Sequence, residues 1–484
     1  MPGFLHVTAA DISAVGPEAF LCVVGIALVL LDAFARSLRP SFPYLTLGGI
    51  AVANFLGGYP TGSAFAGAIE TSELTRFVDL LALAAVALAT LGGGALLARD
   101  RRNQGEFYAL LLWSAAGLIL MVKGDDLLVV FLGLELMSIA LYVLAAWYRE
   151  VAEATEAGMK YFLMGALAST FLLFGVATVY GRLGSTRLTT LKGALASGEG
   201  FSDPMLQVGL LAILSALAFK IALVPFHSWA PDVYQGMTTP AVAFLSTAPK
   251  AAAVVVAVKV LGTLAPSGLG EPWRPLLALL AILSILFGNV VALAQRDLKR
   301  MLAYSGIAQM GYVAIGLATF DGAAFEGILV FLAGYLATNI AAFLAVAALS
   351  NGEKEAHPLA DLAGMGRSRP FAASVLTLAM LSLTGLPPTV GFIGKLLVFR
   401  AAIDAGLMTL ALVGILGSLV SAGYYLRVVY FLWMKEPSRE VAAPDEDVLS
   451  GAAFILVSVA MLYLGVFPRL LLDLARVAAR SLPY

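Results

Sequence analysis

Apolar stretches long enough to cross a bilayer recur along the whole chain. A bilayer core about 30 Å thick requires roughly 20 apolar residues in a helix. The first part of the chain has such predicted spans at residues 16–35, 43–60, 77–98, 107–122, 126–147 and 157–180. The second part adds predicted spans at 205–238, 241–262, 274–294, 301–320, 325–349, 371–402, 407–433 and 448–468. The pattern predicts an all-α polytopic membrane protein with about fourteen transmembrane helices.

Prolines interrupt two of these predicted spans. Proline has no backbone donor and clashes with the preceding turn, so a helix ends or kinks there. The seventh span is interrupted near Pro225, just after Lys220, and the twelfth near Pro387, just before Lys395. We therefore predict broken helices 7 and 12, each with a lysine beside the break.

The two interruptions occupy corresponding places in the two halves of the chain. Transporter folds built from inverted repeats place their ion sites at such broken helices. We predict two inverted five-helix repeats, at about 107–262 and about 274–433, with flanking helices in 16–98 and 448–468. None of the connections resembles a linker between independent units, so residues 1–484 are expected to form a single membrane domain.

Composition supports a membrane protein and narrows its chemistry. Hydrophobic residues make up 60% of the chain and charged residues 13%, and the mean hydropathy is +0.92. The formal net charge is −1 and there is no basic tract, so we expect no nucleic acid partner. The chain has one cysteine, Cys22, and three dispersed histidines, so we expect it to bind no metal, haem or iron–sulfur cluster.

The basic residues of the loops are divided unequally between the two sides of the membrane. One side of the membrane has seven basic loop residues. The positive-inside bias predicts that this side, on which both termini lie, faces outward. The larger, predicted cytoplasmic set is Arg36, Arg39, Arg99, Arg101, Arg102, Arg149, Arg296, Lys299, Arg300, Lys354, Arg367, Arg369, Lys435 and Arg439. The amphipathic tail at 469–480 is expected to lie along the outer interface.

Glu135 lies about ten residues into its span, which is close to the bilayer midplane. Insertion of a charge at that depth costs about 2.5–3.5 kcal/mol on insertion scales. The carboxylate must therefore face the bundle interior and meet a cation, water or a proton. Two interpretations follow: a functional proton carrier, or a structural ion pair that joins two helices.

Lys220, Lys250 and Lys395 are also placed within predicted spans. A buried lysine that gains or loses a neighbouring carboxylate binds or releases a proton near neutral pH. A series of such lysines is typical of a proton relay.

Four further residues have two interpretations each. Lys160 and Lys259 lie near span ends, where they either carry protons or extend to the headgroups. His227 follows the first break and either relays protons through water or caps the second half-helix. Asp232 is expected mainly as a helix-start residue.

With these residues in place, four motifs carry a family resemblance. They are GLELMSIALYVL around Glu135, FKIALVPFHSWAPDVYQGMTTPAVAFLSTAPKAA from Phe219, DLKRMLAYSGIAQMGY from Asp297, and GLPPTVGFIGK from Gly385. The chain closely resembles the antiporter-like subunits of respiratory complex I, and among them the subunit N group of the bacterial proton-pumping NADH-quinone oxidoreductases. The resemblance covers essentially the whole chain. Gln309 stands where some relatives have histidine, so a titrating relay through that span is not expected here.

The resemblance implies a hydrated midplane axis in which Glu135 modulates Lys220. It also implies that Lys250 is the central connecting lysine and Lys395 the terminal one. FMN, the iron–sulfur clusters and the quinone site would belong to partner subunits, both membrane and peripheral, of a complex in the bacterial inner (plasma) membrane. The chain itself would translocate protons and bind no cofactor.

Three other functions remain compatible with the sequence. One is a secondary cation/proton antiporter module, another is the membrane subunit of a related hydrogenase-type complex, and the third is a purely structural scaffold. Co-purification with flavin and iron–sulfur subunits distinguishes the first of these from a complex I subunit.

Overall fold

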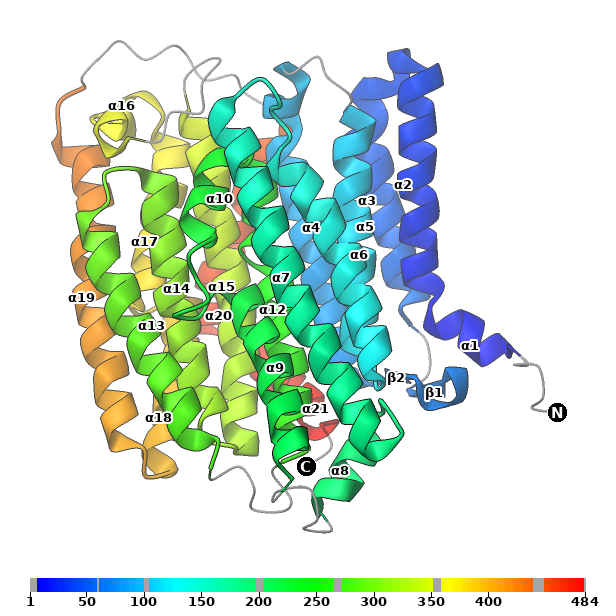
Figure 1. The fold of residues 1–484 in the computed structure, drawn as a ribbon. Helices are drawn as coiled ribbons and strands as arrows, with labels where there is room; N and C mark the ends of the chain where they lie inside the picture. Colours follow the sequence, from blue (N-terminus) through cyan, green and yellow to red (C-terminus); the bar gives the residue numbers. More distant parts are fainter. Residues whose placement is uncertain are drawn as a thin grey trace.

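A computed structural model describes residues 7–58, 61–99, 104–196, 203–264, 272–350, 358–437 and 448–482. Long helices aligned side by side dominate it, with the N-terminal helices at one edge of the molecule (Figure 1). Four residues of the predicted cytoplasmic set lie outside the described residues, as do the two chain ends. These four are Arg101, Arg102, Lys354 and Arg439.

The first half of the chain contains twelve described α-helices. They are α1 (Ala9–Ala14), α2 (Gly16–Phe34), α3 (Phe42–Leu56), α4 (Glu73–Arg99), α5 (Gln104–Lys123), α6 (Leu127–Ala145), α7 (Ala152–Leu183), α8 (Leu188–Ala196), α9 (Pro204–Ile221), α10 (Ala230–Gly236), α11 (Thr239–Leu245) and α12 (Ala248–Gly262). Strands β1 (Gly62–Ala64) and β2 (Ile69–Thr71) pair antiparallel, with Gly62 opposite Thr71. Short 3-10 helices occupy Arg36–Ser41 and Phe65–Gly67.

The second half continues with helices of similar length. They are α13 (Arg274–Ala294), α14 (Leu298–Leu317), α15 (Gly322–Leu349), α16 (Met365–Ser368), α17 (Pro370–Thr384), α18 (Val390–Asp404), α19 (Met408–Met434), α20 (Val448–Val466) and α21 (Arg469–Arg480). A 3-10 helix at Leu359–Leu362 precedes α16.

Among the described residues, eleven helical segments are long and apolar enough to cross a membrane, and α17 is a shorter apolar helix. The predicted all-α, multi-pass architecture is therefore confirmed, while the count of fourteen stays a prediction. The segment from Thr239 to Gly262 is wholly buried and the apolar middle of helix α15 is also buried, whereas α6 and α7 expose large apolar side chains such as Leu132 and Leu167. Such an outer face is suited to lipid or to neighbouring subunits.

The helix starts follow ordinary capping chemistry. The carboxylates of Asp126 and Asp297 accept hydrogen bonds from the amides of Leu128 and Arg300, which fixes the first turns of α6 and α14. Proline occupies the first turn of α9, α10, α12 and α17, where its missing donor costs nothing.

The helices end at the two predicted interruptions in the same way. Helix α9 closes with the Leu223 amide bonded to the Ala218 carbonyl, and α17 with the Leu386 amide bonded to the Leu381 carbonyl. Each closure needs a left-handed residue, which is Ala222 (φ 60°) in one case and Gly385 (φ 88°) in the other. Both ends are therefore Schellman motifs.

A third interruption was not predicted. The segment 241–262, expected to be continuous, divides into α11 and α12 at Ser246 and Thr247. The Thr247 hydroxyl bonds back to the Ala243 carbonyl at 2.8 Å, and Pro249 follows in the first turn of α12. Pro249 supplies no amide to the preceding turn, so the helix restarts just ahead of Lys250.

Candidate proton-transfer site

Lys220 lies in the last turn of α9, directly before the break. Its ammonium is almost fully buried and donates a hydrogen bond to the Ser138 hydroxyl at 2.7 Å. The aromatic rings of Tyr142 and Tyr161 have their centroids 5.5 and 5.6 Å from the ammonium. Such rings stabilise the positive charge through their π faces.

Glu135 lies on α6 one turn before Ser138 and is half-buried. Its carboxylate accepts a hydrogen bond from the Ser169 hydroxyl on α7. Glu135 and Lys220 form no ion pair within 4.0 Å in the described part of the chain, so the direct contact that a Glu–Lys pair would need is absent. Ser138, one turn beyond Glu135 on α6, contacts Lys220.

Lys250 is only 1% exposed, on a helix that is wholly buried. Its ammonium makes no hydrogen bond with any described residue, and the Tyr234 ring centroid is 5.7 Å away. The ammonium lies close to Gly306, where an added Cβ would stand 3.5 Å from the ammonium and 3.0 Å from the Tyr335 hydroxyl. A buried ammonium in such surroundings is costly to keep charged.

Lys395 follows the second break and turns back onto the end of α17. Its ammonium donates to the carbonyls of Leu383 at 2.8 Å and Thr384 at 3.1 Å. These are C-terminal carbonyls of a helix, where a cation is favoured. The Gln309 amide donates to the same Leu383 carbonyl at 2.9 Å, so Gln309 serves as a positioning group for this helix end.

A small cavity of about 10 Å³ lies beside Lys395 and is lined in part by Gln309, Tyr335 and Ser382. Tyr335 therefore lines this cavity, and its hydroxyl also lies with the Lys250 ammonium around the Cβ position of Gly306. Tyr335 is thus near both Lys250 and Lys395.

Lys160 is partly exposed and forms ion pairs with Glu156 and Asp232, both at 2.6 Å. Asp232 does not cap α10, since the structure has no side-chain cap there; its other carboxylate oxygen binds Arg300 of α14 at 2.6 Å. Asp232 thus lies in the first turn of α10, as predicted, but its side chain does not cap that helix, and its carboxylate joins α7, α10 and α14.

His227 is half-buried. Its ring packs edge-on against the ring of Phe287, with 4.6 Å between the two ring centroids. Its side chain does not cap α10. Lys259, for which the sequence left proton transfer and extension to the headgroups open, is buried, and its ammonium donates to the carbonyls of Val122 at 3.1 Å and Gly124 at 2.7 Å.

A polar cavity of about 790 Å³ lies at the end of the bundle that carries the small sheet, and Lys259 and Asp125 are among its lining residues. Burial raises the pKa of Asp125 from 3.8 to about 6, while the positive charge of Lys259 opposes the shift. Among the described residues, no group of three or more His, Cys, Asp or Glu side chains is arranged to hold a metal ion.

Comparison with known proteins identifies the family of the chain. Residues 124–421 match the family described as "NADH:quinone oxidoreductase/Mrp antiporter, TM". The chain belongs to this family. NADH-quinone oxidoreductase subunit N of Trichlorobacter lovleyi is 38% identical over 97% of each chain.

Solved structures have the same fold. A chain of respiratory complex I from Thermus thermophilus is 35% identical, with a TM-score of 0.78 over 95% of this chain and 99% of that one. A chain of the Mrp complex from Dietzia is 21% identical with a TM-score of 0.83 over 97% of each chain, which shows the shared fold alone. The antiporter-like segment includes Glu135, Lys220, Lys250 and Lys395.

Several residues of this antiporter-like site were not identified from sequence. Ser138, Ser169 and Tyr335 have ordinary residue types for a membrane helix, and only their neighbours in space give them a role. For Ser138 a signal existed, because it follows Glu135 by three residues and so shares a helix face with it.

Proposed function

We propose that this chain is a proton-translocating membrane subunit of an NADH-quinone oxidoreductase. Electron transfer from NADH to quinone occurs in other subunits and drives proton movement through a midplane axis of Glu135, Lys220, Lys250 and Lys395. His227 is proposed as an accessory relay group, and Lys160 as a weaker one.

The observation that carries this proposal is the burial of three lysines without counter-ions. Lys220, Lys250 and Lys395 are each at most 5% exposed, and none has a carboxylate within 4.0 Å among the described residues. A permanent charge in that setting is costly, whereas a lysine that alternates between the charged and neutral forms is a proton carrier.

The neighbours of the lysines support the order of transfer. Glu135 is near Lys220 through Ser138, and a carboxylate that moves toward this lysine favours its protonation. The Tyr335 hydroxyl and the Lys250 ammonium both lie close to Gly306, and Tyr335 also lines the cavity of Lys395. Protons would therefore pass from Lys220 through Lys250 to Lys395.

The proposed function includes a domain architecture, a location in the membrane and partner subunits. Residues 1–484 form one membrane domain with inverted repeats at about 107–262 and 274–433, which the matching Schellman ends of α9 and α17 support. The domain spans the bacterial inner membrane about fourteen times, with both termini in the periplasm. FMN, iron–sulfur clusters and quinone are bound by partner subunits.

The test replaces Lys220 or Lys395 by alanine in the assembled complex and measures proton pumping coupled to NADH oxidation. We expect pumping to fall with either variant while the complex still assembles. Lys435→Ala, at an exposed position, is the matched control. Unchanged pumping in an assembled Lys220→Ala complex would remove that lysine from the mechanism.

A second candidate is a secondary cation/proton antiporter module, which the family description and the fold shared with the Mrp complex favour. Purification of the native assembly distinguishes the two. Flavin and iron–sulfur subunits in the assembly favour the oxidoreductase. Sodium-dependent proton exchange by an assembly without them favours the antiporter.

A further inference from the structure

The ring of Tyr312 on α14 lies against the terminal lysine of the proposed axis. The Lys395 ammonium is 4.8 Å from the ring centroid. Phe399, one turn beyond Lys395 on α18, packs edge-on against the same ring, with 5.8 Å between the two ring centroids. An aromatic ring attracts a cation, and the attraction is stronger when water is excluded. Tyr312 is buried, so its ring stabilises the charged form of Lys395 as long as it keeps this place.

The hydroxyl end of this ring is held by Asn289 on α13. The Asn289 amide nitrogen donates to the Tyr312 hydroxyl at 3.3 Å and to the Ile285 carbonyl at 2.8 Å. The Tyr424 hydroxyl of α19 donates to the Asn289 side-chain oxygen at 2.9 Å. Asn289 and Tyr424 are both buried, so these hydrogen bonds are shielded from bulk water. Asn289 thus joins α13, α14 and α19 at the hydroxyl end of the ring.

Helix α19 comes close to these two polar groups at Gly417. Figure 1 shows α19 along the edge of the bundle, next to α13. A Cβ added at Gly417 would stand 3.1 Å from both the Asn289 amide nitrogen and the Tyr312 hydroxyl. That is closer than ordinary van der Waals contact, so the backbone of α19 leaves the two groups little room to move. The Tyr312 ring is therefore fixed at its hydroxyl end by packing as well as by hydrogen bonding.

We propose that Asn289 is a positioning residue for Lys395. It holds the Tyr312 ring against the ammonium and thereby stabilises the protonated lysine, and Tyr424 in turn holds Asn289. The inference rests on the proposed function, in which Lys395 is the terminal proton carrier. The alternative is a purely structural network, because interhelical hydrogen bonds also hold membrane helices together.

The other titratable groups around α18 do not account for the charge of Lys395. Tyr335 of α15 lines the cavity beside Lys395, but phenols ionise only near about pH 10. Helix α17 has no charged or titratable side chain. On the other helices that pack against α18, such groups are exposed or engaged elsewhere. The exposed ones are Arg400, Asp404, Tyr430 and Tyr463, and the engaged ones are Lys299 with the Met237 carbonyl, Arg300 with Asp232, Tyr304 with Phe287, Glu326 with Arg476, Tyr425 with Gln309 and Arg427 with the Leu293 carbonyl.

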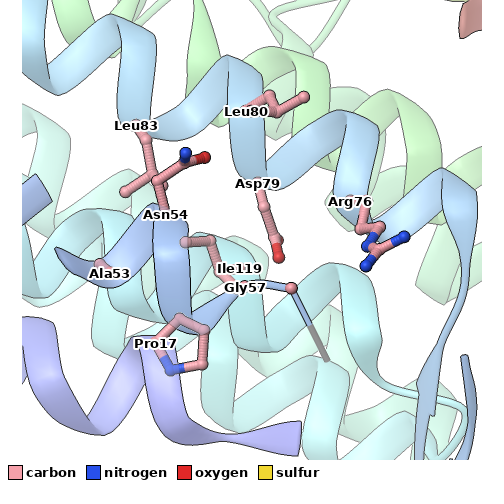
Figure 2. A pocket seen from close by; sticks show the side chains of 10 residues that line it. Pro17, Ala53, Asn54, Gly57, Arg76, Asp79, Leu80, Leu83 and Ile119 are labelled. Carbon is pink, nitrogen blue, oxygen red and sulfur yellow. The ribbon is translucent and has the colours of Figure 1, made fainter. Parts of the chain in front are cut away.

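The test follows proton pumping by the intact complex as a function of pH. Tyr312→Leu removes the ring, whereas Asn289→Leu and Tyr312→Phe keep the ring and remove the hydrogen bond that holds it. The control is Asn54→Leu, which changes an exposed asparagine among the N-terminal helices. Figure 2 shows Asn54 beside a separate cavity of about 170 Å³, which residues of α2, α3, α4 and α5 line.

The measured quantity is the pH at which pumping falls by half on the alkaline side. Without the ring the protonated lysine is less stable and loses its proton at a lower pH, so we expect this value to shift down by about one pH unit in Tyr312→Leu. Asn289→Leu and Tyr312→Phe should shift it in the same direction by less. The double variant Asn289→Leu/Tyr312→Phe should shift it no further than the larger single change, because both changes cut the same hydrogen bond. The control should keep the wild-type profile.

The outcome that overturns the inference is read against Lys395→Ala. Where Lys395→Ala loses pumping, a wild-type profile in Asn289→Leu, or shifts that add in the double variant, would show that Asn289 only joins helices. Tyr424→Phe deletes the hydroxyl that holds Asn289 and replaces Asn289→Leu where that complex does not assemble. It should shift the profile in the same direction, and a wild-type profile in it also overturns the inference.

Thermal unfolding of the complex separates this inference from the proposed function. The held ring stabilises a charge, so Asn289→Leu should lower the unfolding temperature less in a Lys395→Met complex than in the wild type. Equal lowering in both backgrounds overturns the inference and leaves the proposed function intact if Lys395→Ala loses pumping. Unequal lowering together with normal pumping in Lys395→Ala supports the positioning role and overturns the proposed function instead.

Discussion

The Lys220 ammonium donates a hydrogen bond of 2.7 Å to the Ser138 hydroxyl. Ser138 is on the same helix as Glu135, one turn beyond it. The serine thus links α6, the helix that carries Glu135, to the buried lysine by a hydrogen bond. A hydroxyl both donates and accepts hydrogen bonds, so it can contact the lysine in its charged and its neutral form.

Replacement of Ser138 by alanine tests this link. The lysine loses a hydrogen bond worth about 1.5–3 kcal/mol to a charged group, and we expect pumping to fall about tenfold while the complex assembles. Ser114→Ala is the matched control, because Ser114 is equally buried and bonds only the Met137 carbonyl, at 3.2 Å. Equal pumping in both variants would contradict a role for Ser138.

Gly306 provides a test of the packing around Lys250 and Tyr335, because both polar groups lie close to it. An alanine there places its methyl 3.0 Å from the Tyr335 hydroxyl, which is closer than ordinary packing, so the tyrosine must move. Overpacking of this kind costs about 1–3 kcal/mol, and we expect proton pumping to fall in proportion. Gly48→Ala, whose Cβ meets nothing within 4 Å, should leave pumping and stability unchanged.

Asp232 is expected to contribute to stability and not to proton transfer. Asp232→Asn weakens ion pairs with Lys160 and Arg300 that are about one-third exposed, so the loss should be about 1 kcal/mol and should shrink in high salt. Thermal unfolding of the complex at low and high salt measures this loss of stability. Arg400→Gln, in an exposed pair with Asp404, serves as the control and should change the unfolding temperature little. A loss of pumping with unchanged stability would reverse this assignment.

Asp125 should make stability depend on pH. Its pKa is raised by burial from 3.8 to about 6, so the folded chain binds this proton more tightly than the unfolded chain. Ionisation therefore destabilises the fold as pH rises through this window, and the penalty is complete above about pH 6. In Asp125→Asn the unfolding temperature should fall less between pH 4 and pH 7 than in the wild type, by calorimetry of the complex.

The neighbouring carboxylate supplies the control for that experiment. Asp126 caps α6 through the Leu128 amide and also binds the Thr186 hydroxyl, so Asp126→Ala, which removes both bonds, should lower stability at pH 4 and at pH 7 alike. A wild-type slope in Asp125→Asn would show that Asp125 does not titrate in this window.

The sequence was informative wherever a residue type conflicted with its surroundings. Lysines and a glutamate within apolar stretches identified the candidate axis, and prolines located both predicted interruptions. The division at Ser246 was missed, because small polar residues in an apolar run are compatible with a continuous helix. The contacts of Asp232 and Lys259 depend on which helices pack against each other. Local sequence patterns contain no information on that packing.

The double pairing of Asp232 has a mechanical consequence. One of its oxygens is held by α7 and the other by α14, each at 2.6 Å, while the residue itself lies on the short helix between them. Any movement that separates α7 from α14 must lengthen one of these two ion pairs. A displacement that begins in one half of the bundle is thereby transmitted to α10, the element that follows the break beside Lys220.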